Sequence, residues 1–133
     1  MKVFISFYVL ALLVLSATLF QDTALKESME RGSEIYADFC VTCHLEKGEG
    51  VATVFPPLAN SDYLMEKREA SIHALKFGLQ GEITVNGETY NSAMASLGLE
   101  DEEIADVMNY ISNSWGNSSE KIVTVEEVES VSK

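Results

Sequence analysis

The stretch that most constrains this chain is Cys40 to His44, in which two cysteines stand three positions apart and a histidine follows directly. This Cys-x-x-Cys-His spacing is the attachment sequence for c-type haem. Each thiol adds to one vinyl group of the haem, so the cysteine spacing must match the vinyl spacing along one porphyrin edge, and the adjacent imidazole then reaches the iron. We therefore predict one covalent haem c bound through Cys40 and Cys43, with His44 as the proximal iron ligand.

Two other uses of the same residues are weaker. A bare Cys-x-x-Cys dithiol motif is expected within a βαβ unit and does not need the histidine. A zinc site would need two more ligands. Outside the motif the chain offers only His73, because it contains two cysteines and two histidines in all. For the same reason no cysteine remains for a disulfide.

The N-terminus is almost wholly apolar over residues 3–20, which follow Lys2. We predict that residues 1–21 are either an export signal peptide, the favoured alternative, or a membrane anchor retained through residues 3–20. The apolar run just reaches the length that spans a bilayer, and no clean Ala-x-Ala cleavage site follows it. Export agrees with the motif, because haem is attached to such motifs outside the bacterial cytoplasmic membrane. The expected location is therefore periplasmic, either soluble or anchored to the outer face of that membrane.

The rest of the chain is strongly acidic. Without Lys2, eight basic residues oppose 21 acidic ones, which gives a balance of −13. Such a surface argues against binding of nucleic acid or of anionic lipid headgroups. It suits electrostatic steering onto a redox protein that presents a basic docking patch, although the solubility of an exported protein explains the acidity equally well.

Helix and turn signals divide the region after residue 21 into short elements. A polar lead-in covers 22–27, and a helix is predicted over 28–39. A Gly-containing loop over 45–55 follows and is closed by two prolines. We then expect a short helix from Asn60 or Ser61 to Lys67 and a helix over 69–77 that Gly78 stops. A hairpin over 83–90 with Asn-Gly at its turn, a loop over 91–99 and a last helix over 101–115 complete the prediction. We assign residues 22–117 to one domain and residues 118–133 to an acidic C-terminal tail that lies along the surface or is mobile.

Over residues 28–117 the chain resembles the class I c-type cytochromes, especially small bacterial monohaem cytochromes. Besides the haem motif, the matching positions are Gly32 and Tyr36 in the first helix, Val107 and Tyr110 in the last helix, the Pro56-Pro57-Leu58 stretch, and Met94. The resemblance implies an all-α cytochrome c fold, in which the N- and C-terminal helices cross around one covalently bound haem. It also implies a small β-hairpin before the loop that carries the distal methionine.

The resemblance further implies how the iron is held. Met94 is the implied distal ligand, and the second ring N–H of His44 is expected to bond the carbonyl of Pro56, or of Pro57 if the alignment shifts by one. Position alone leaves the distal site open to other candidates. These are Met29, Met65, Met108 and His73, or no ligand at all.

Two residues depart from the family pattern. Ala95 follows Met94, where the family usually has a proline, so the methionine loop is expected to be looser. Glu100 stands where a Ser or Thr usually caps the last helix, and we expect this to cost about 1 kcal/mol of stability.

A haem held by a histidine and a methionine favours electron transfer over catalysis, because two strong ligands leave no place for a substrate. We therefore predict a monohaem electron carrier of a respiratory chain and not an enzyme. The alternatives are an electron-transfer subunit tethered in a membrane oxidoreductase complex, or a haem peroxidase or gas sensor with an open sixth site.

Overall fold

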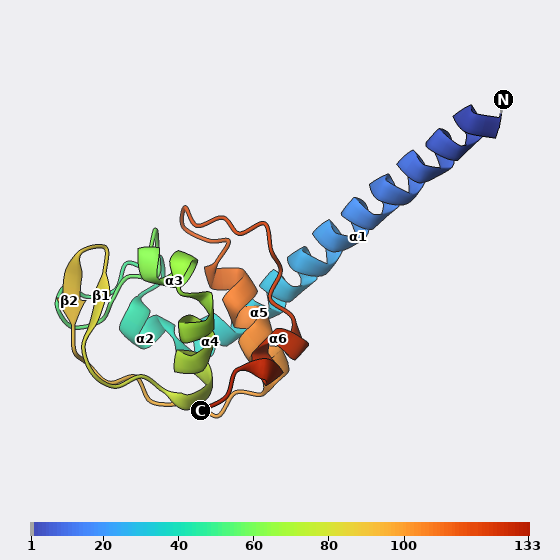
Figure 1. The fold of residues 1–133 in the computed structure, drawn as a ribbon. Coiled ribbons are helices and arrows are strands. Elements are labelled where there is room, and N and C mark those ends of the chain that lie inside the picture. Colours follow the sequence, from blue (N-terminus) through green and yellow to red (C-terminus); the bar gives the residue numbers. More distant parts are fainter. Residues whose placement is uncertain (1) are drawn as a thin grey trace.

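The computed structural model describes the backbone of residues 2–133, and their side chains apart from those of 2–11 and 17–19. Helix α1 (Lys2–Phe39) is a single helix of 38 residues, and its N-terminal part projects from the rest of the molecule (Figure 1). The predicted polar lead-in over 22–27 is therefore wrong, because this segment is also helical. The physical reason is that α1 contains no proline and no glycine before Gly32, so nothing interrupts it.

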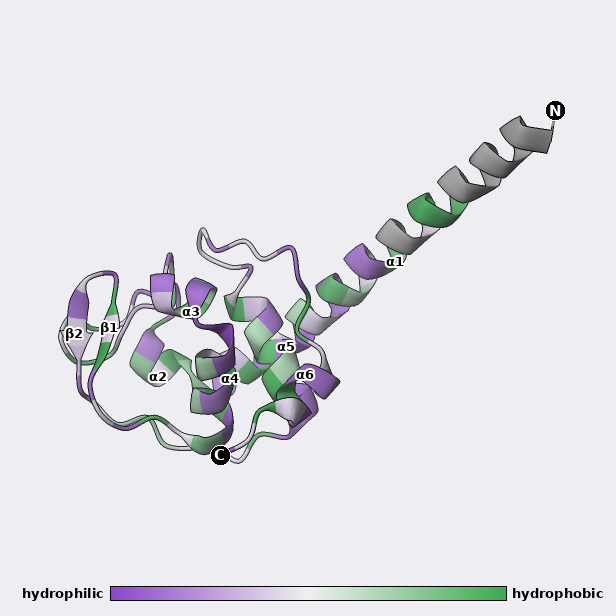
Figure 2. Cartoon of the chain, viewed as in Figure 1, coloured by the Kyte–Doolittle hydropathy of each residue, from purple (hydrophilic) through white to green (hydrophobic). Residues whose placement is uncertain are grey.

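The predicted signal or anchor over residues 1–21 falls largely outside the described side chains. Its described members include Leu12 to Leu15 and Phe20, and all of these are exposed, Phe20 to 81%. Figure 2 shows apolar residues on this projecting part of α1. Among the described residues, no helix contains a stretch that is both long and apolar enough to cross a membrane.

Three short helices follow α1. They are α2 (Val41–His44), α3 (Asp62–Glu66) and α4 (Arg68–Phe77). Ser61 caps α3, since its Oγ accepts the Leu64 N–H at 3.2 Å. Gly78 ends α4 with a φ of 84°, a conformation that glycine adopts without strain. Both boundary signals were predicted from the sequence and are confirmed.

The predicted hairpin is present as β1 (Ile83–Val85) paired antiparallel with β2 (Glu88–Tyr90). Asn86 and Gly87 form its turn with φ values of 51° and 82°, as a type I′ turn requires. The hairpin is fastened to the start of α3, because Asp62 and Asn86 each accept the other's backbone N–H, at 2.7 and 3.0 Å.

The last helix of the predicted domain is α5 (Asp101–Ile111), which ends four residues before the predicted boundary at Trp115. The side chains of Asn113 and Ser114 donate to main-chain carbonyls of the final turn, at 3.0 and 2.7 Å. Such side-chain bonds compete with continuation of the helix. Trp115 then turns away with a φ of 52°. At the other end, the Glu103 side chain accepts the Glu100 N–H at 2.9 Å and so offsets part of the capping loss.

Helices α1 and α5 make the most extensive contact between elements. They approach most closely at Gly32, where an added Cβ would overlap the backbone carbonyl of Asp106 and lie 2.8 Å from the Tyr110 Cβ. The Tyr36 and Tyr110 rings pack beside this point with centroids 5.6 Å apart. Val107 is fully buried in the same core. The predicted crossing of the first and last helices is therefore present, with Asp106 as an additional partner of Gly32.

A polar seam joins the two helices beside this crossing, in which Ser28, Asp106 and Asn109 are buried and Arg31 is exposed. Asp106 accepts bonds from Ser28 at 2.6 Å and from two nitrogens of Arg31 at 2.6 and 2.8 Å. Asn109 donates to Ser28 Oγ at 2.9 Å and exchanges two bonds with the backbone of Val123, at 2.7 and 2.9 Å. We call Ser28, Arg31, Asp106 and Asn109 the helix seam.

The segment 118–133 is packed against the domain and includes α6 (Val125–Ser130). Its valines at 123, 128 and 131 are buried in the core. Arg68 binds Glu127 at 2.7 and 2.8 Å, and Lys76 donates to the Val128 carbonyl at 2.9 Å. The sequence-based picture of a surface-lying or mobile tail missed this packing, because the acidic composition obscured the spacing of the valines.

Candidate haem site

Cys40 connects α1 to α2, and Cys43 and His44 lie within α2. The His44 N–H bonds the Cys40 carbonyl at 2.9 Å, so all three residues lie within one helical turn. Cys40 is buried and Cys43 half-buried. Burial raises the pKa of the Cys40 thiol to about 11, with a smaller contribution from Cys43, so this thiol is uncharged at neutral pH.

His44 is oriented by the backbone of the following loop. Its Nδ1 lies 3.0 Å from the Pro56 carbonyl oxygen, and since a carbonyl can only accept, Nδ1 carries the hydrogen. The lone pair of the neutral ring is therefore on Nε2, which is the nitrogen that can bind a metal. Burial lowers the pKa of His44, and the bond to Pro56 opposes this shift. The neutral ring is thus the stable form at physiological pH.

Gly50 makes this orientation possible, and the sequence analysis did not single it out. Its N–H bonds the His44 carbonyl at 3.0 Å, which closes the loop behind the histidine. Its φ is 63°, and an added Cβ would collide with the Phe55 carbonyl oxygen and lie 2.7 Å from the Pro56 oxygen. A glycine six residues after the histidine was visible in the sequence only as a loop signal.

An apolar cavity lies over His44. Its walls come from α2, α3, α4, β1 and α5 and from the loops between them. Aliphatic, proline and methionine side chains dominate, including Pro57, Leu58, Leu64, Leu75, Leu79, Ile83, Val85, Val107, Met108 and Ile111. A smaller adjoining hollow is lined by Cys43, Phe55 and Tyr90. His44, Pro56 and Met94 line both. An apolar space beside two thiols and an imidazole fits a porphyrin.

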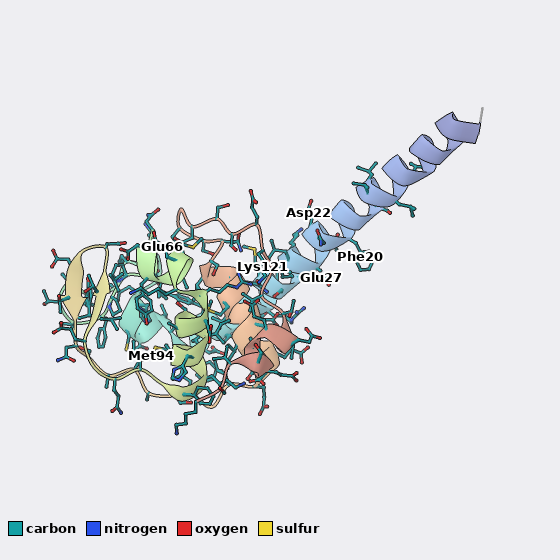
Figure 3. The ribbon with its side chains drawn as sticks, viewed as in Figure 1. Phe20, Asp22, Glu27, Glu66, Met94 and Lys121 are labelled. Atoms are coloured by element: carbon teal, nitrogen blue, oxygen red, sulfur yellow. The ribbon has the colours of Figure 1, made fainter. Side chains whose placement is uncertain are left out.

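Met94 is fixed by a backbone bridge that the sequence did not reveal. Its N–H and carbonyl both pair with Leu79, at 2.9 and 2.8 Å, just after α4. Ser96 adds a bond from its hydroxyl to the Lys76 carbonyl at 2.9 Å. Gly78 allows this close approach, because a Cβ there would lie 2.8 Å from the Met94 oxygen. The loop expected to be loose at Ala95 is therefore tied to the end of α4 by these bonds. Figure 3 labels the Met94 side chain within the domain.

The other candidate ligands are placed less favourably. Met108 is fully buried on α5 as part of the core, although it also lines the cavity. His73 packs on Phe77 with ring centroids 4.9 Å apart and does not line the cavity. Met65 is 37% exposed on α3, and Met29 lines a shallow surface hollow on α1.

Comparison with known proteins decides the family. Residues 29–115 match the family model for Cytochrome c. The chain belongs to the cytochrome c family. Membership confirms the resemblance seen in the sequence, and it means that the chain carries covalently bound haem c and transfers electrons.

Two kinds of relative are similar to this cytochrome. Cytochrome c-552 of Thermus thermophilus is 43% identical over 106 residues, which cover 73% of this chain and 80% of that protein. The cytochrome c subunit of alcohol dehydrogenase (quinone) from Gluconobacter oxydans (strain 621H) is 32% identical over 103 residues, covering 74% of this chain but 21% of that protein. The gluconate 2-dehydrogenase cytochrome c subunit of Pantoea cypripedii is 30% identical over 113 residues, covering 80% of this chain and 25% of that protein.

Proposed function

We propose that this chain is an exported monohaem electron carrier in which His44 and Met94 bind the iron of one haem. One observation carries the proposal: His44 and Met94 line the same apolar cavity, and both are held in place by backbone contacts. His44 is oriented by its hydrogen bond to the Pro56 carbonyl, and Met94 by its two backbone hydrogen bonds to Leu79.

Each residue has a distinct task. The haem supplies an iron that gains or loses one electron. Cys40 and Cys43 keep the group attached, and the Pro56 carbonyl fixes the orientation and basicity of His44. The Met94 thioether favours the reduced iron over what a second histidine would give. The apolar walls exclude water, which disfavours the additional charge of the oxidised site.

The same arrangement argues against catalysis. With a histidine on one side and a methionine on the other, no coordination position is left for a substrate. The proposed partners are therefore other redox proteins, one that donates a single electron and one that accepts it. We place this exchange in the periplasm, with residues 1–21 serving as the export signal or as an anchor on the outer face of the cytoplasmic membrane.

The test is Met94→Ala in the holo-protein. The haem should stay attached, because Cys40, Cys43 and His44 are unchanged. The near-infrared Met–iron absorption should vanish, the reduction potential should fall, and the iron should bind carbon monoxide.

The control is Met108→Leu, which exchanges one buried apolar side chain for another and should leave all three properties unaltered. An unchanged spectrum in Met94→Ala would rule out Met94 as the ligand, and His73→Ala would then be the next variant to examine.

A further inference from the structure

A second hollow, outside the haem cavity, lies between the end of α1 and the start of α5. Ile35 and Phe39 provide its apolar surface, and Phe39 is 48% exposed. The lining also includes four carboxylates, from Glu34, Asp38, Glu102 and Glu103, and the Arg31–Asp106 pair. We call this hollow the Phe39 groove. An exposed aromatic ring surrounded by charged side chains is typical of the centre of a protein interface.

The charge of the groove has one sign. Its only lining cation is Arg31, whose guanidinium is already bound to Asp106 in the helix seam. That bond is the main reason that the pKa of Arg31 is raised, so the two charges of this pair offset each other. In the described part of the chain, none of the four carboxylates forms an ion pair with a cation. The groove therefore presents an excess of negative charge beside its apolar side chains, although Glu103 accepts the Glu100 N–H and Glu102 interacts with Arg31.

Other cations of the domain are held elsewhere. Arg68 is bound to Glu127, and Lys76 to Asp101 and the Val128 carbonyl. These side chains fasten the C-terminal segment and are not available to neutralise the groove. The negative field at the Phe39 groove is thus a consequence of how the fold uses its few basic residues.

The groove is connected to the haem site through the chain. Phe39 directly precedes Cys40, and Cys40 lines the haem cavity. A partner side chain that contacts Phe39 is therefore separated from a haem-bearing residue by a single peptide bond. Because electron transfer slows steeply with distance, this is a favourable place for a redox partner to dock.

We propose that the Phe39 groove is the surface on which a redox partner docks, and that the partner inserts an apolar side chain flanked by Lys or Arg. The inference rests on the proposed electron-carrier function and adds the location and chemistry of the contact. A second copy of this chain does not fit, because its surface has the same negative sign. Anionic lipid and nucleic acid are repelled for the same reason.

The test compares two triple variants of the full holo-protein with equal net charge. The groove variant is Glu34→Gln, Asp38→Asn and Glu102→Gln. The control variant is Glu66→Gln, Glu82→Gln and Glu120→Gln, whose side chains are exposed and lie outside the groove. Electron exchange is measured by stopped flow against a lysine-rich cytochrome c as the probe, at low and at moderate salt.

We expect the groove variant to exchange about tenfold more slowly than the control at low salt and to lose most of its salt dependence. Phe39→Ser should slow exchange at both salt concentrations, because it removes the apolar contact. Equal slowing in the two triple variants would assign the effect to general acidity and overturn the docking site. A wild-type rate that does not depend on salt, or no exchange with the probe, would overturn it as well.

The outcome is separable from failure of the proposed function. All of these variants should keep the Met–iron band and the reduction potential of the wild type, since none of the altered residues lines the haem cavity. If the Met94 assignment failed instead, Met94→Ala would leave the spectrum unchanged, whatever the groove variants do.

Discussion

The helix seam and the haem cavity are two halves of one small core, and they are completed in different ways. The seam is self-sufficient: Asp106 receives three bonds from Ser28 and Arg31, and Asn109 is bonded to Ser28 and to Val123. The cavity walls, in contrast, are almost wholly apolar side chains that face one another. Polar groups thus specify how α1 and α5 meet, whereas the walls of the cavity need a large apolar group between them to be stable.

The largest expected effect comes from withholding the haem. In the double variant Cys40→Ala, Cys43→Ala, the chain should be largely unfolded, because a core of this size is not stable without the contacts that the haem provides. Hydrogen exchange should be fastest in α3, α4 and the loop of Met94, and any remaining protection should lie in α1 and α5. A haem-free protein that unfolds in one sharp cooperative transition would contradict the division into two halves.

The close approach of α1 to α5 at Gly32, beside the helix seam, is the next point to test. Gly32→Leu should destabilise the protein by about 3 kcal/mol, the upper end for overpacking, because the added side chain meets the backbone of α5 and not a movable side chain. The same change at the exposed Ala37 of α1 is the control and should leave the melting temperature nearly unaltered. If both variants melt together with the wild type, the crossing point has been misplaced.

The bonds of Asn109 should matter less than the Gly32 contact. Asn109→Ala removes three hydrogen bonds and leaves the backbone of Val123 without its partners, at a cost of about 1–3 kcal/mol. Chemical denaturation should show this loss, while the haem spectrum should be unaltered because Asn109 does not line the cavity. The exposed Asn91→Ala is the control. A shifted haem spectrum would indicate that the two halves are more strongly coupled than we infer.

The smallest expected effect depends on pH. The guanidinium of Arg68 lowers the pKa of Glu127 below its ordinary value, so the native state favours the ionised carboxylate. This stabilisation is present above the unfolded-state pKa of about 4.3 and is lost as the pH falls through the lower native pKa. The stability difference between the wild type and Glu127→Gln should be under about 1 kcal/mol at neutral pH and should shrink on acidification. A difference that grows with acid would reverse the assigned sign.

Features set by neighbouring residues were predictable from the sequence. The Asn86-Gly87 turn, the Ser61 cap and the stop at Gly78 depend on local backbone preferences, and each is present. The bond from His44 to the Pro56 carbonyl came from the family resemblance, and the structure contains it at 3.0 Å.

Features that depend on distant partners were not predictable in the same way. The Leu79–Met94 bridge joins residues from two loops, and no local sequence pattern predicts it. The end of α5 at Ile111 depends on side chains that turn back onto the helix, although the apolar spacing continues to Trp115. The packing of Val123, Val128 and Val131 required knowledge of the surface they would meet.

The buried valines of the C-terminal segment have a consequence for how the protein matures. They are synthesised after the haem motif, and Asn109 cannot make its bonds to Val123 before that residue has emerged. The core of the domain therefore closes only after Cys40 and Cys43 have left the ribosome. The order of synthesis leaves an interval in which both thiols are accessible before the domain forms around them.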